Sequence, residues 1–225
     1  MMAHYEIEVK SLLGEKSKAE ELVVKMNELD SSCARVSENK QLNHYFKDGD
    51  IKKLFEKTKS LFKEAEVDKF KHIVEKGSGF SVRTRQKDDE VLLVVKASID
   101  EGTSENTVSR LEFEESVSLA LKELDALVID AGFEYQAKWS REREEYSYKG
   151  INVCIDRNAG YGYLAEFEKV TEDGDSVSQV RSEIGALMEE LGVEELPQDR
   201  LERMFKYYNQ SWPEYYGTDK TFVVE

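Results

Sequence analysis

The chain opens with a short stretch in which apolar and polar side chains alternate strictly. From residue 5 to residue 10, the odd positions hold tyrosine, isoleucine and valine, and the even positions hold Glu6, Glu8 and Lys10. Because successive side chains of a β-strand point to opposite faces, this pattern predicts a strand with one apolar and one charged face. Such a strand suits either a protein surface or the wall of a wet, charged cavity, and the rest of the chain has to decide between them.

The two-residue period returns along the chain and alternates with apolar residues at helical spacing. Apolar residues three and four positions apart predict helices over residues 15–30, 50–65, 117–131, 177–191 and 199–208. Alternating runs predict strands over residues 5–10, 34–47, 80–86, 91–97, 107–115, 133–148, 151–156 and 161–170. About eight antiparallel strands close into a small barrel with room for one ligand. We therefore expect an α+β fold, in which a closed eight-stranded antiparallel β-barrel encloses a charged lumen and the helices pack outside it.

A chain of 225 residues is long enough for one sizeable domain with its own core and short for two. We expect the core of this single domain to cover about residues 4–192. The lysine-rich residues 47–79 are predicted to form a helical insertion or lid, although a solvated excursion or a docking surface for a partner would look the same. Residues 193–225 are predicted to form a C-terminal helix and tail.

The composition argues against several classes of protein. The formal charge of −15 disfavours a nucleic-acid partner, because neutralising phosphates requires clustered lysine and arginine. The two cysteines, Cys33 and Cys154, have no metal-ligand spacing and no disulfide framework, as expected in a reducing compartment. The start of the sequence is too charged for a signal peptide, and the longest apolar run, residues 91–95, is too short to span a membrane. We expect a cytoplasmic protein with no nucleic-acid or membrane partner.

Most of the predicted strands carry charged side chains two residues apart, so that the charges share one face. These residues are Glu6, Glu8, Lys10, Arg83, Arg85, Lys96, Arg110, Glu112, Glu114, Arg141, Arg143, Asp156, Glu166 and Glu168. For any single strand, a solvated face is the simpler explanation. Repetition over seven strands changes the balance, because a solvated face would also carry threonine, serine and glutamine. If the sheet closes, the charges meet in a lumen, where unpaired charges are costly.

Ligands that carry the missing counter-charges would make such a lumen stable. A polyphosphate would pair with the arginines and lysines, because a guanidinium group binds two phosphate oxygens at once. Hard divalent cations would pair with the surplus carboxylates, and the lack of a histidine or cysteine cluster favours Mg²⁺ or Mn²⁺ over zinc. The three histidines are scattered at positions 4, 44 and 72, and a structural or surface role is expected for each.

The segment Glu6-Ile7-Glu8-Val9-Lys10 resembles the ExExK motif of the CYTH superfamily, also called the triphosphate tunnel metalloenzymes. The later elements of the family follow in its order. They are Arg83-Thr84-Arg85, Lys96 at the end of an apolar strand, Arg110-Leu111-Glu112-Phe113-Glu114, Arg141-Glu142-Arg143 before Tyr146, Asp156 at a strand end, and Glu166-Phe167-Glu168. The resemblance spans roughly residues 4–192. The chain departs from the family at residues 47–79, which look longer, and in the final helix, where the family's serine–tyrosine pair is not evident.

The resemblance implies a β-tunnel that binds a triphosphate together with a divalent metal. Members of the family hydrolyse inorganic triphosphate, thiamine triphosphate or RNA 5′-triphosphates, or they cyclise ATP to cyclic AMP. We therefore expect a metal-dependent triphosphatase that uses Mg²⁺ or Mn²⁺ and acts on inorganic triphosphate or on a small organic or nucleoside triphosphate. The sequence leaves open whether two chains form a homodimer.

The resemblance also implies roles for the charged residues. The implied metal ligands are Glu6, Glu8, Glu166 and Glu168, with Asp156, Glu112 and Glu114 holding a second ion or its waters. The implied phosphate-binding residues are Lys10, Arg83, Arg85, Lys96, Arg110, Arg141 and Arg143. Among all of these, we expect Glu8, Lys10 and Glu168 to act directly in catalysis. For each residue, the alternative is a purely structural ion pair.

Other functions compete with hydrolysis. An adenylate cyclase of the class IV type would need an aromatic slot for adenine, which Tyr45, Phe46 and Tyr163 would offer, although core packing explains these rings equally well. A non-catalytic binder of polyphosphate or nucleotide would keep the basic residues, but it has little use for so many carboxylates. A plain scaffold ranks last.

Overall fold

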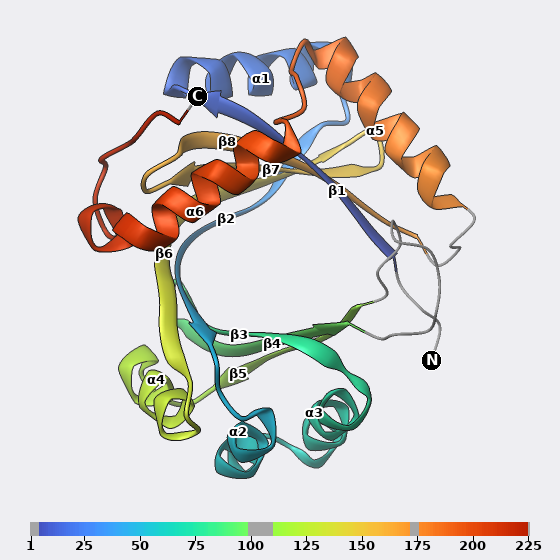
Figure 1. Ribbon diagram of the computed structural model, residues 1–225. Coiled ribbons are helices and arrows are strands. Elements are labelled where there is room, and N and C mark those ends of the chain that lie inside the picture. Colours follow the sequence, from blue (N-terminus) through green and yellow to red (C-terminus); the bar gives the residue numbers. More distant parts are fainter. Residues whose placement is uncertain (1–4, 99–109, 172–175, 225) are drawn as a thin grey trace. The chain divides into compact units, whose positions relative to one another are not determined.

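The computed structural model describes residues 5–98, 110–171 and 176–224. The strands are β1 (Tyr5–Gly14), β2 (Ala34–Lys47), β3 (Ser78–Lys87), β4 (Glu90–Ser98), β5 (Arg110–Val117), β6 (Glu134–Tyr148), β7 (Ile151–Asn158) and β8 (Gly162–Thr171). The helices are α1 (Lys16–Leu29), α2 (Ile51–Thr58), α3 (Glu64–Lys76), α4 (Leu121–Asp130), α5 (Val177–Leu191) and α6 (Gln198–Tyr215), with a 3-10 turn, η1 (Lys59–Leu61) (Figure 1).

The strands form one sheet in the order β1-β8-β7-β6-β2-β3-β4-β5, antiparallel in every pair whose register is defined. The chain divides into two compact units. The first unit holds residues 1–40 and 140–225, and the second unit holds residues 41–139. The boundaries between the units fall inside β2 and β6, so these two strands contribute residues to both.

The prediction of a closed barrel is wrong. In the strand order, β1 and β5 stand at opposite ends, and no pairing joins them within the described residues. Instead, the Lys10 carbonyl of β1 accepts a hydrogen bond of 2.7 Å from the backbone N–H of Leu196, in the segment after α5. A barrel requires its two terminal strands to exchange backbone hydrogen bonds. The sheet is therefore open. The alternation of apolar and charged residues could not distinguish the two cases, because it is the same in an open sheet as in a closed barrel.

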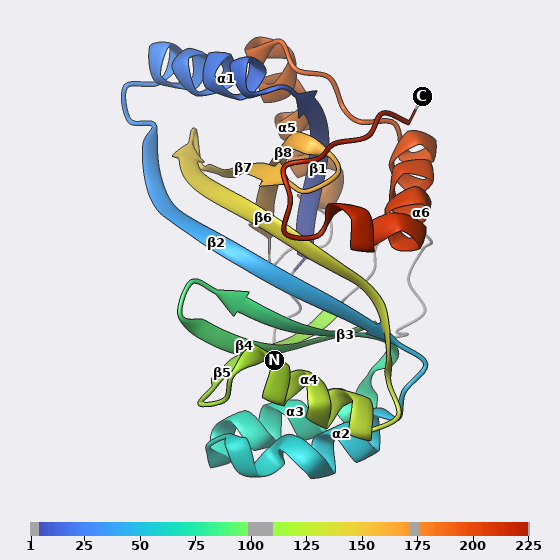
Figure 2. The same ribbon diagram turned by 90° about the vertical axis from the view of Figure 1, so that its left-hand side faces the viewer.

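In the first unit, helices α1 and α5 pack against the apolar face of β1 and β8 (Figures 1 and 2). Alternation places Ile7 and Val9 of β1 and Phe167 of β8 on this face. All three are buried there in one cluster with Met26 of α1 and Ile184 of α5. Glu8, Lys10 and Glu166 therefore lie on the face away from the helices. Lys169 of β8 is on the helix side instead, where it pairs with Glu183 of α5.

The C-terminal tail folds back onto the first unit. Helix α6 extends past its predicted end, to Tyr215, and the chain after it returns to the turn between β7 and β8. There the Gly160 N–H donates to the Lys220 carbonyl, and the Phe222 N–H donates to the Gly160 carbonyl, both at 2.8 Å. These two hydrogen bonds fix the turn that joins the two strands.

In the second unit, helices α2, α3 and α4 lie on the apolar side of β3, β4 and β5 (Figure 2). Phe70 of α3 stacks on Phe113 of β5 with ring centroids 4.6 Å apart, and both side chains are fully buried. Residues 47–79, the predicted insertion or lid, thus contain α2, η1 and α3 and contribute to this core. The strand predicted over residues 107–115 begins at Arg110 in the described chain, and residues 107–109 lie outside the described part.

A buried polar network ties α4 to the strands of the second unit. Asp125 of α4 accepts hydrogen bonds from Thr84 of β3 at 2.5 Å and from Tyr135 of β6 at 2.6 Å. The carboxylate also lies 2.7 Å from Nδ1 of His44 of β2. Burial alone would raise the pKa of Asp125, but the hydrogen bonds outweigh it and lower the pKa. Asp125 is therefore a well-satisfied structural anchor, which links one helix to three strands.

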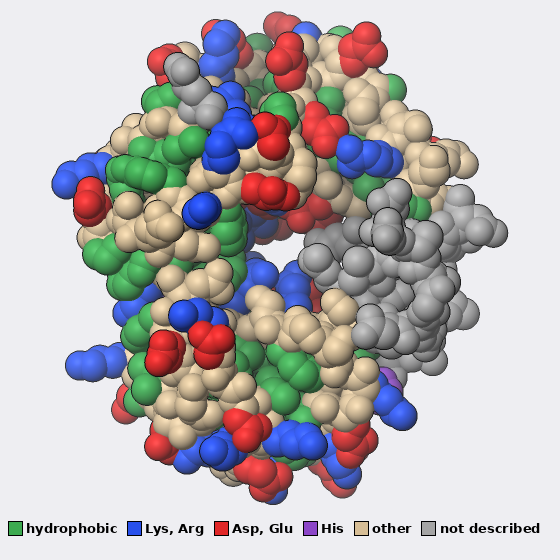
Figure 3. Space-filling view, viewed as in Figure 1, with side chains coloured by type: hydrophobic (Ala, Val, Ile, Leu, Met, Phe, Trp, Pro, Cys, Tyr) green, Lys and Arg blue, Asp and Glu red, His purple; other side chains and the backbone are tan. Residues whose placement is uncertain are grey.

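On the face of the molecule that Figure 3 shows, acidic and basic side chains are interleaved. On α1, for example, Lys16 and Glu20 form an exposed ion pair one helical turn apart. Within the part of the chain that the structure describes, no helix is both long enough and apolar enough to cross a membrane.

We predict that Gly160→Ala destabilises the protein more than Gly150→Ala. Both glycines have positive φ angles, 86° and 76°, which alanine adopts only with strain. A Cβ at Gly160 would lie 2.8 Å from atoms of Phe222 and Tyr208, whereas nothing lies within 4 Å at Gly150. Urea unfolding should therefore show a loss of unfolding free energy about 2 kcal/mol larger for the first variant, from overpacking. Equal losses would contradict the packing of the C-terminal tail on this turn.

Candidate functional site

The charged face of the first unit carries one row of side chains that crosses four strands. Lys10 of β1 stands directly opposite Glu166 of β8. On β7, Cys154 stands opposite Glu166 on one side and opposite Glu145 of β6 on the other. Directly opposite residues of antiparallel strands lie on the same face of a sheet. The row therefore follows from strand register, which brings together residues as far as 156 positions apart in the sequence.

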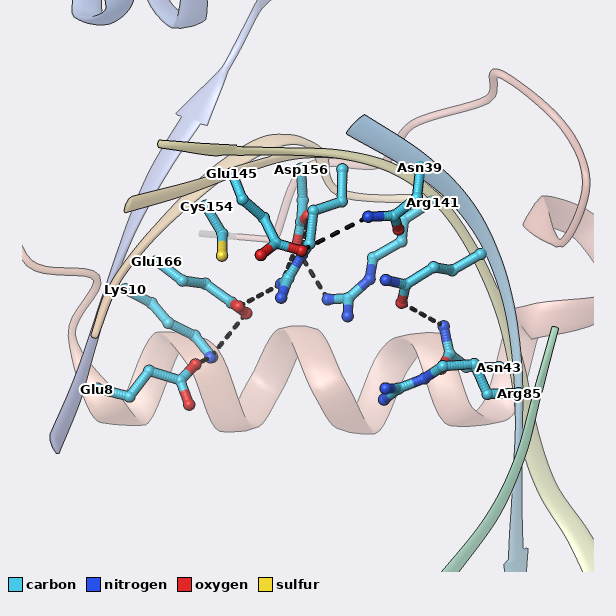
Figure 4. A network of polar contacts seen from close by, with 12 residues as sticks. Glu8, Lys10, Asn39, Asn43, Arg85, Arg141, Glu145, Cys154, Asp156 and Glu166 are labelled. Carbon is cyan, nitrogen blue, oxygen red and sulfur yellow. Dashed lines mark hydrogen bonds and ion pairs between the residues drawn. The ribbon is translucent and has the colours of Figure 1, made fainter. Parts of the chain in front are cut away.

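Ion pairs connect the members of this row to their neighbours. The Lys10 ammonium bonds the carboxylate of Glu8 on its own strand, and it lies 2.9 Å from Oε1 of Glu166. The Arg143 guanidinium of β6 bonds Glu166 in turn. Figure 4 shows Glu8, Lys10 and Glu166 pointing toward one another. A single lysine thus bridges two carboxylates that come from different strands.

Asp156 of β7 is the buried end of the network. Arg143 binds it through two hydrogen bonds of 2.7 Å, from Nε to Oδ1 and from Nη2 to Oδ2, and Arg141 donates to Oδ2 at 2.9 Å. The Asp156 side chain is only 1% exposed. A carboxylate buried this deeply is stable only when cations pair with it, and two arginines do so here. The connected network, which we call the first-unit network, is Glu8–Lys10–Glu166–Arg143–Asp156–Arg141.

Exposure increases along this network from Asp156 toward β1. The side chains of Arg143 and Glu166 are 12% and 13% exposed, whereas those of Lys10 and Glu8 are 27% and 35% exposed. Burial alone would raise the pKa of Glu166, but the charges of Lys10 and the two arginines outweigh it and lower the pKa to about 2. Burial would lower the pKa of Arg143, but its two carboxylate partners raise it above its ordinary value. Both groups are therefore ionised at neutral pH.

The second unit has its own charged face, on the side of its strands away from the helices. Arg85 of β3 donates from Nε to the side-chain oxygen of Asn43 at 2.7 Å and from Nη1 to Glu114 at 2.6 Å. Lys96 of β4 and Glu112 of β5 stand opposite each other and form an ion pair of 3.1 Å. Acids and bases therefore pair across strands in this unit as well.

Aromatic residues lie on both faces of β2. Tyr45 is on the charged face, where its ring centroid lies 4.5 Å from Cζ of Arg83. Phe46, the next residue, is on the apolar face and stacks on Tyr135 with centroids 4.9 Å apart. Because Tyr45 and Phe46 point to opposite faces, they do not line one slot for adenine together.

The structure gathers the predicted site residues within each unit. The first unit brings together Glu8, Lys10, Arg141, Arg143, Asp156 and Glu166 in one network, and the second unit carries Arg83, Arg85, Lys96, Glu112 and Glu114 on one face. Glu168 stands opposite Glu8 across β1 and β8. Glu6 and Arg110 lie in β1 and β5, but their side chains are outside the described part of the structure. Metal or phosphate binding by each of these residues stays a prediction.

Three members of the site region were missed by reasoning from sequence: Asn39, Glu145 and Cys154. The buried side-chain amide of Asn39 lies 3.5 Å from Glu145. Burial raises the pKa of the Cys154 thiol to about 12, so the thiol is protonated at neutral pH. Glu145 could have been found, because it continues the two-residue spacing of Arg141 and Arg143. Asn39 and Cys154 carry no charge, and a search for charged faces does not detect them.

The carboxylates of the first unit are oxygen ligands of the type that divalent metals such as Mg²⁺ bind, but they do not form a complete coordination shell. Glu8 and Glu166 share the Lys10 ammonium, so a positive charge already lies between two oxygen ligands. Within the described residues, no three or more acidic, histidine or cysteine side chains are grouped to hold an ion. Mg²⁺ typically uses one or two carboxylates and completes its shell with waters and substrate phosphates. Glu8 and Glu166 suit such an ion, whereas both oxygens of Asp156 bond arginine.

Comparison with known proteins establishes the family. A family model described as "CYTH domain" matches residues 70–200, which is more than half of the chain. The chain therefore belongs to the CYTH domain family. No curated protein matches it in sequence.

Solved structures resemble the chain in fold at low sequence identity. The PH1819 protein of Pyrococcus horikoshii OT3 is 21% identical, with 90% of this chain and 99% of that chain covered and a TM-score of 0.59. The PH1012 protein of the same organism is 17% identical, with 84% and 91% covered and a TM-score of 0.57. A candidate adenylate cyclase from Vibrio parahaemolyticus is 13% identical, with 90% and 98% covered and a TM-score of 0.58. At these identities, the likeness concerns the fold alone.

We predict that the stability cost of Glu166→Gln depends on pH. The lowered pKa means that ionised Glu166 stabilises the folded state fully above about pH 4.5, its ordinary pKa, and that this contribution is lost as the pH falls toward 2. The variant should therefore be less stable than the parent by a few kcal/mol at neutral pH, and the gap should shrink as the pH falls through this window. Urea unfolding without metal, at a series of pH values, measures the gap.

The matched control for this measurement is Glu20→Gln. Glu20 forms an exposed ion pair with Lys16, and such pairs contribute little to stability. Its unfolding free energy should follow that of the parent at every pH. A gap for Glu166→Gln that does not change with pH would show that the network does not hold Glu166 in its ionised form.

Proposed function

We propose that this CYTH-family protein is a divalent-metal-dependent triphosphatase that hydrolyses inorganic triphosphate or a small organic or nucleoside triphosphate. The observation that supports this most is the first-unit network, in which acids and bases alternate on one face of four strands. A binder of anions would need only the basic members, and a site for a metal ion would need only the acidic ones. A triphosphate that binds with its metal requires both.

The basic members of the network suit phosphate oxygens. Arg141 and Arg143 are already oriented by Asp156, and a guanidinium group can bind two oxygens of one phosphate. Lys10, at the more exposed end, would neutralise charge that builds on the leaving group. The raised pKa of Arg143 supports this role, because the guanidinium carries its charge before any ligand binds.

The acidic members suit a hard cation. Glu8 and Glu166 would hold Mg²⁺ or Mn²⁺, while Lys10 turns from these carboxylates to the substrate. When bound, the ion supplies charge neutralisation and activates water for attack on the terminal phosphorus. Glu168, opposite Glu8, and Glu6, on the same strand, are further proposed ligands. Of these residues, we propose Glu8, Lys10 and Glu168 for direct roles in the reaction.

The charged face of the second unit is included on the same chemical grounds. The proposed phosphate-binding residues there are Arg83, Arg85, Lys96 and Arg110. Glu112 and Glu114 are proposed to bind a second ion or its waters, and the same proposal covers Asp156 in the first unit. Glu112 and Glu114 each bond a protein cation, so binding a metal would require an exchange of partners.

We predict that the purified protein releases phosphate from inorganic triphosphate when Mg²⁺ or Mn²⁺ is present and not when both are removed. A screen that resolves the products of inorganic triphosphate, ATP, GTP and thiamine triphosphate would identify the substrate. Cyclic AMP with pyrophosphate, formed from ATP, would overturn the proposal in favour of a cyclase. The absence of turnover with every substrate and either metal would favour a non-catalytic binder.

We predict that Glu8→Gln weakens Mn²⁺ binding and slows metal-dependent turnover, each by at least about tenfold, because an amide oxygen is a poorer ligand than a carboxylate. Electron paramagnetic resonance of Mn²⁺ measures the binding without relying on activity. The Glu8 side chain is 35% exposed, so the variant should unfold as cooperatively in urea as the parent does. Glu20→Gln, on the exposed surface of α1, should change neither quantity. An unchanged affinity for Mn²⁺ in Glu8→Gln would remove this residue from the metal site.

A further inference from the structure

Arg83 and Arg85 lie two residues apart on the charged face of β3, yet they have different kinds of partner. Arg85 is held by Asn43 and by the carboxylate of Glu114, which neutralises its charge. Arg83 forms no ion pair among the described residues, and its Nε is buried without a hydrogen-bond acceptor there. Its close contact is instead with the ring of Tyr45.

Strand register places an aromatic ring directly beside Arg83. Arg83 stands opposite Tyr45 on β2 and opposite Val94 on β4, and neither neighbour carries a negative charge. The 4.5 Å between Cζ of Arg83 and the Tyr45 ring centroid lies within the range of a cation–π contact. Trp139 of β6 lies 6.4 Å from Tyr45, with the two rings tilted by 60°, and it is buried. A second ring therefore limits the movement of Tyr45.

We propose that Tyr45 is a positioning residue, whose ring holds the Arg83 guanidinium in place and leaves its positive charge available to a phosphate oxygen. A carboxylate orients an arginine but also cancels its charge, so an incoming anion has to displace it. An aromatic face attracts the cation through its quadrupole and occupies none of the N–H donors in the guanidinium plane. The ring therefore orients Arg83 and leaves its N–H donors and its charge available to an anion. Arg85 differs, because the carboxylate of Glu114 neutralises its charge.

The unsatisfied donor of Arg83 is the reason to expect an anion there. A buried polar group without a partner is costly, and the cost is larger when the group is charged. A phosphate oxygen would supply both the missing acceptor and the missing negative charge. The identity of the anion, a phosphate group of the triphosphate, rests on the proposed function, whereas the orientation of Arg83 by Tyr45 rests on the geometry.

The test measures the Kd of inorganic triphosphate by calorimetry in a metal chelator, so that no turnover is required. Tyr45→Leu removes the ring and should weaken binding about tenfold, the size expected for a desolvated cation–π contact. Tyr45→Phe keeps the ring and should bind like the parent. Phe55→Leu is the matched control, because Phe55 lies under the Lys59 ammonium at 5.8 Å in the same unit but belongs to α2. This control should also bind like the parent.

A double-mutant cycle shows whether the ring acts through the arginine. Once Arg83→Met has been introduced, Tyr45→Leu should have no further effect on the Kd. With Mg²⁺ or Mn²⁺ present, Tyr45→Leu alone should raise KM by a larger factor than it lowers kcat. Cooperative unfolding of every variant in urea checks that a loss of binding is not a loss of fold.

Several results would overturn the inference. They are an unchanged Kd in Tyr45→Leu, an equal loss in Tyr45→Phe, additive effects in the cycle, or a parent protein that does not bind triphosphate. Failure of the proposed function looks different. If the expected binding pattern occurs without turnover under any metal, Tyr45 positions Arg83 in an anion binder and the triphosphatase proposal fails alone. If turnover occurs and Tyr45→Leu binds like the parent, the inference fails and the triphosphatase proposal stands.

Discussion

Burying a charge is costly unless an opposite charge lies beside it, and this constraint shapes the charged faces of both units, with Arg83 as an exception that the Tyr45 ring holds. Asp156 meets it with two arginines around a carboxylate that water hardly reaches. Nearer the edge of the sheet, Lys10 meets it between Glu8 and Glu166, where the side chains are more exposed. Because the other face of these strands packs on helices, alternation places these charged residues together on one face. The pairing of acids and bases there is a condition for folding as well as for function.

The same pairing limits what the first unit can bind. Every carboxylate of the first-unit network bonds a protein cation, so a ligand has to exchange partners with groups that are already satisfied. A ligand with one kind of charge would leave half of the separated groups unpaired. A polyphosphate with its metal supplies both kinds, so each separated group finds a new partner. A network that stabilises the fold is in this way also selective for a ligand of mixed charge.

Contacts outside the charged faces hold the charged strands in register. In the second unit, the buried carboxylate of Asp125 links α4 to β2, β3 and β6 through hydrogen bonds with His44, Thr84 and Tyr135. In the first unit, the C-terminal tail fixes the turn between β7 and β8 through the backbone of Gly160. A slip of one residue would move every charged side chain of a strand to the apolar face. The contact at Gly160 therefore helps to preserve the row that joins Lys10, Glu166 and Glu145, and the contacts of Asp125 do the same for the charged face of the second unit.

The sequence by itself determined the periods of the helices and strands and the set of charges on each strand, because both are local properties of the chain. It also carried the ordered motifs of the CYTH family. Tertiary structure alone decided that the sheet stays open, with the Lys10 carbonyl bonded to Leu196. It also decided that both oxygens of Asp156 bond arginines and that Glu145 joins the row. These outcomes depend on register and edge contacts between segments far apart in the chain, which no local pattern specifies.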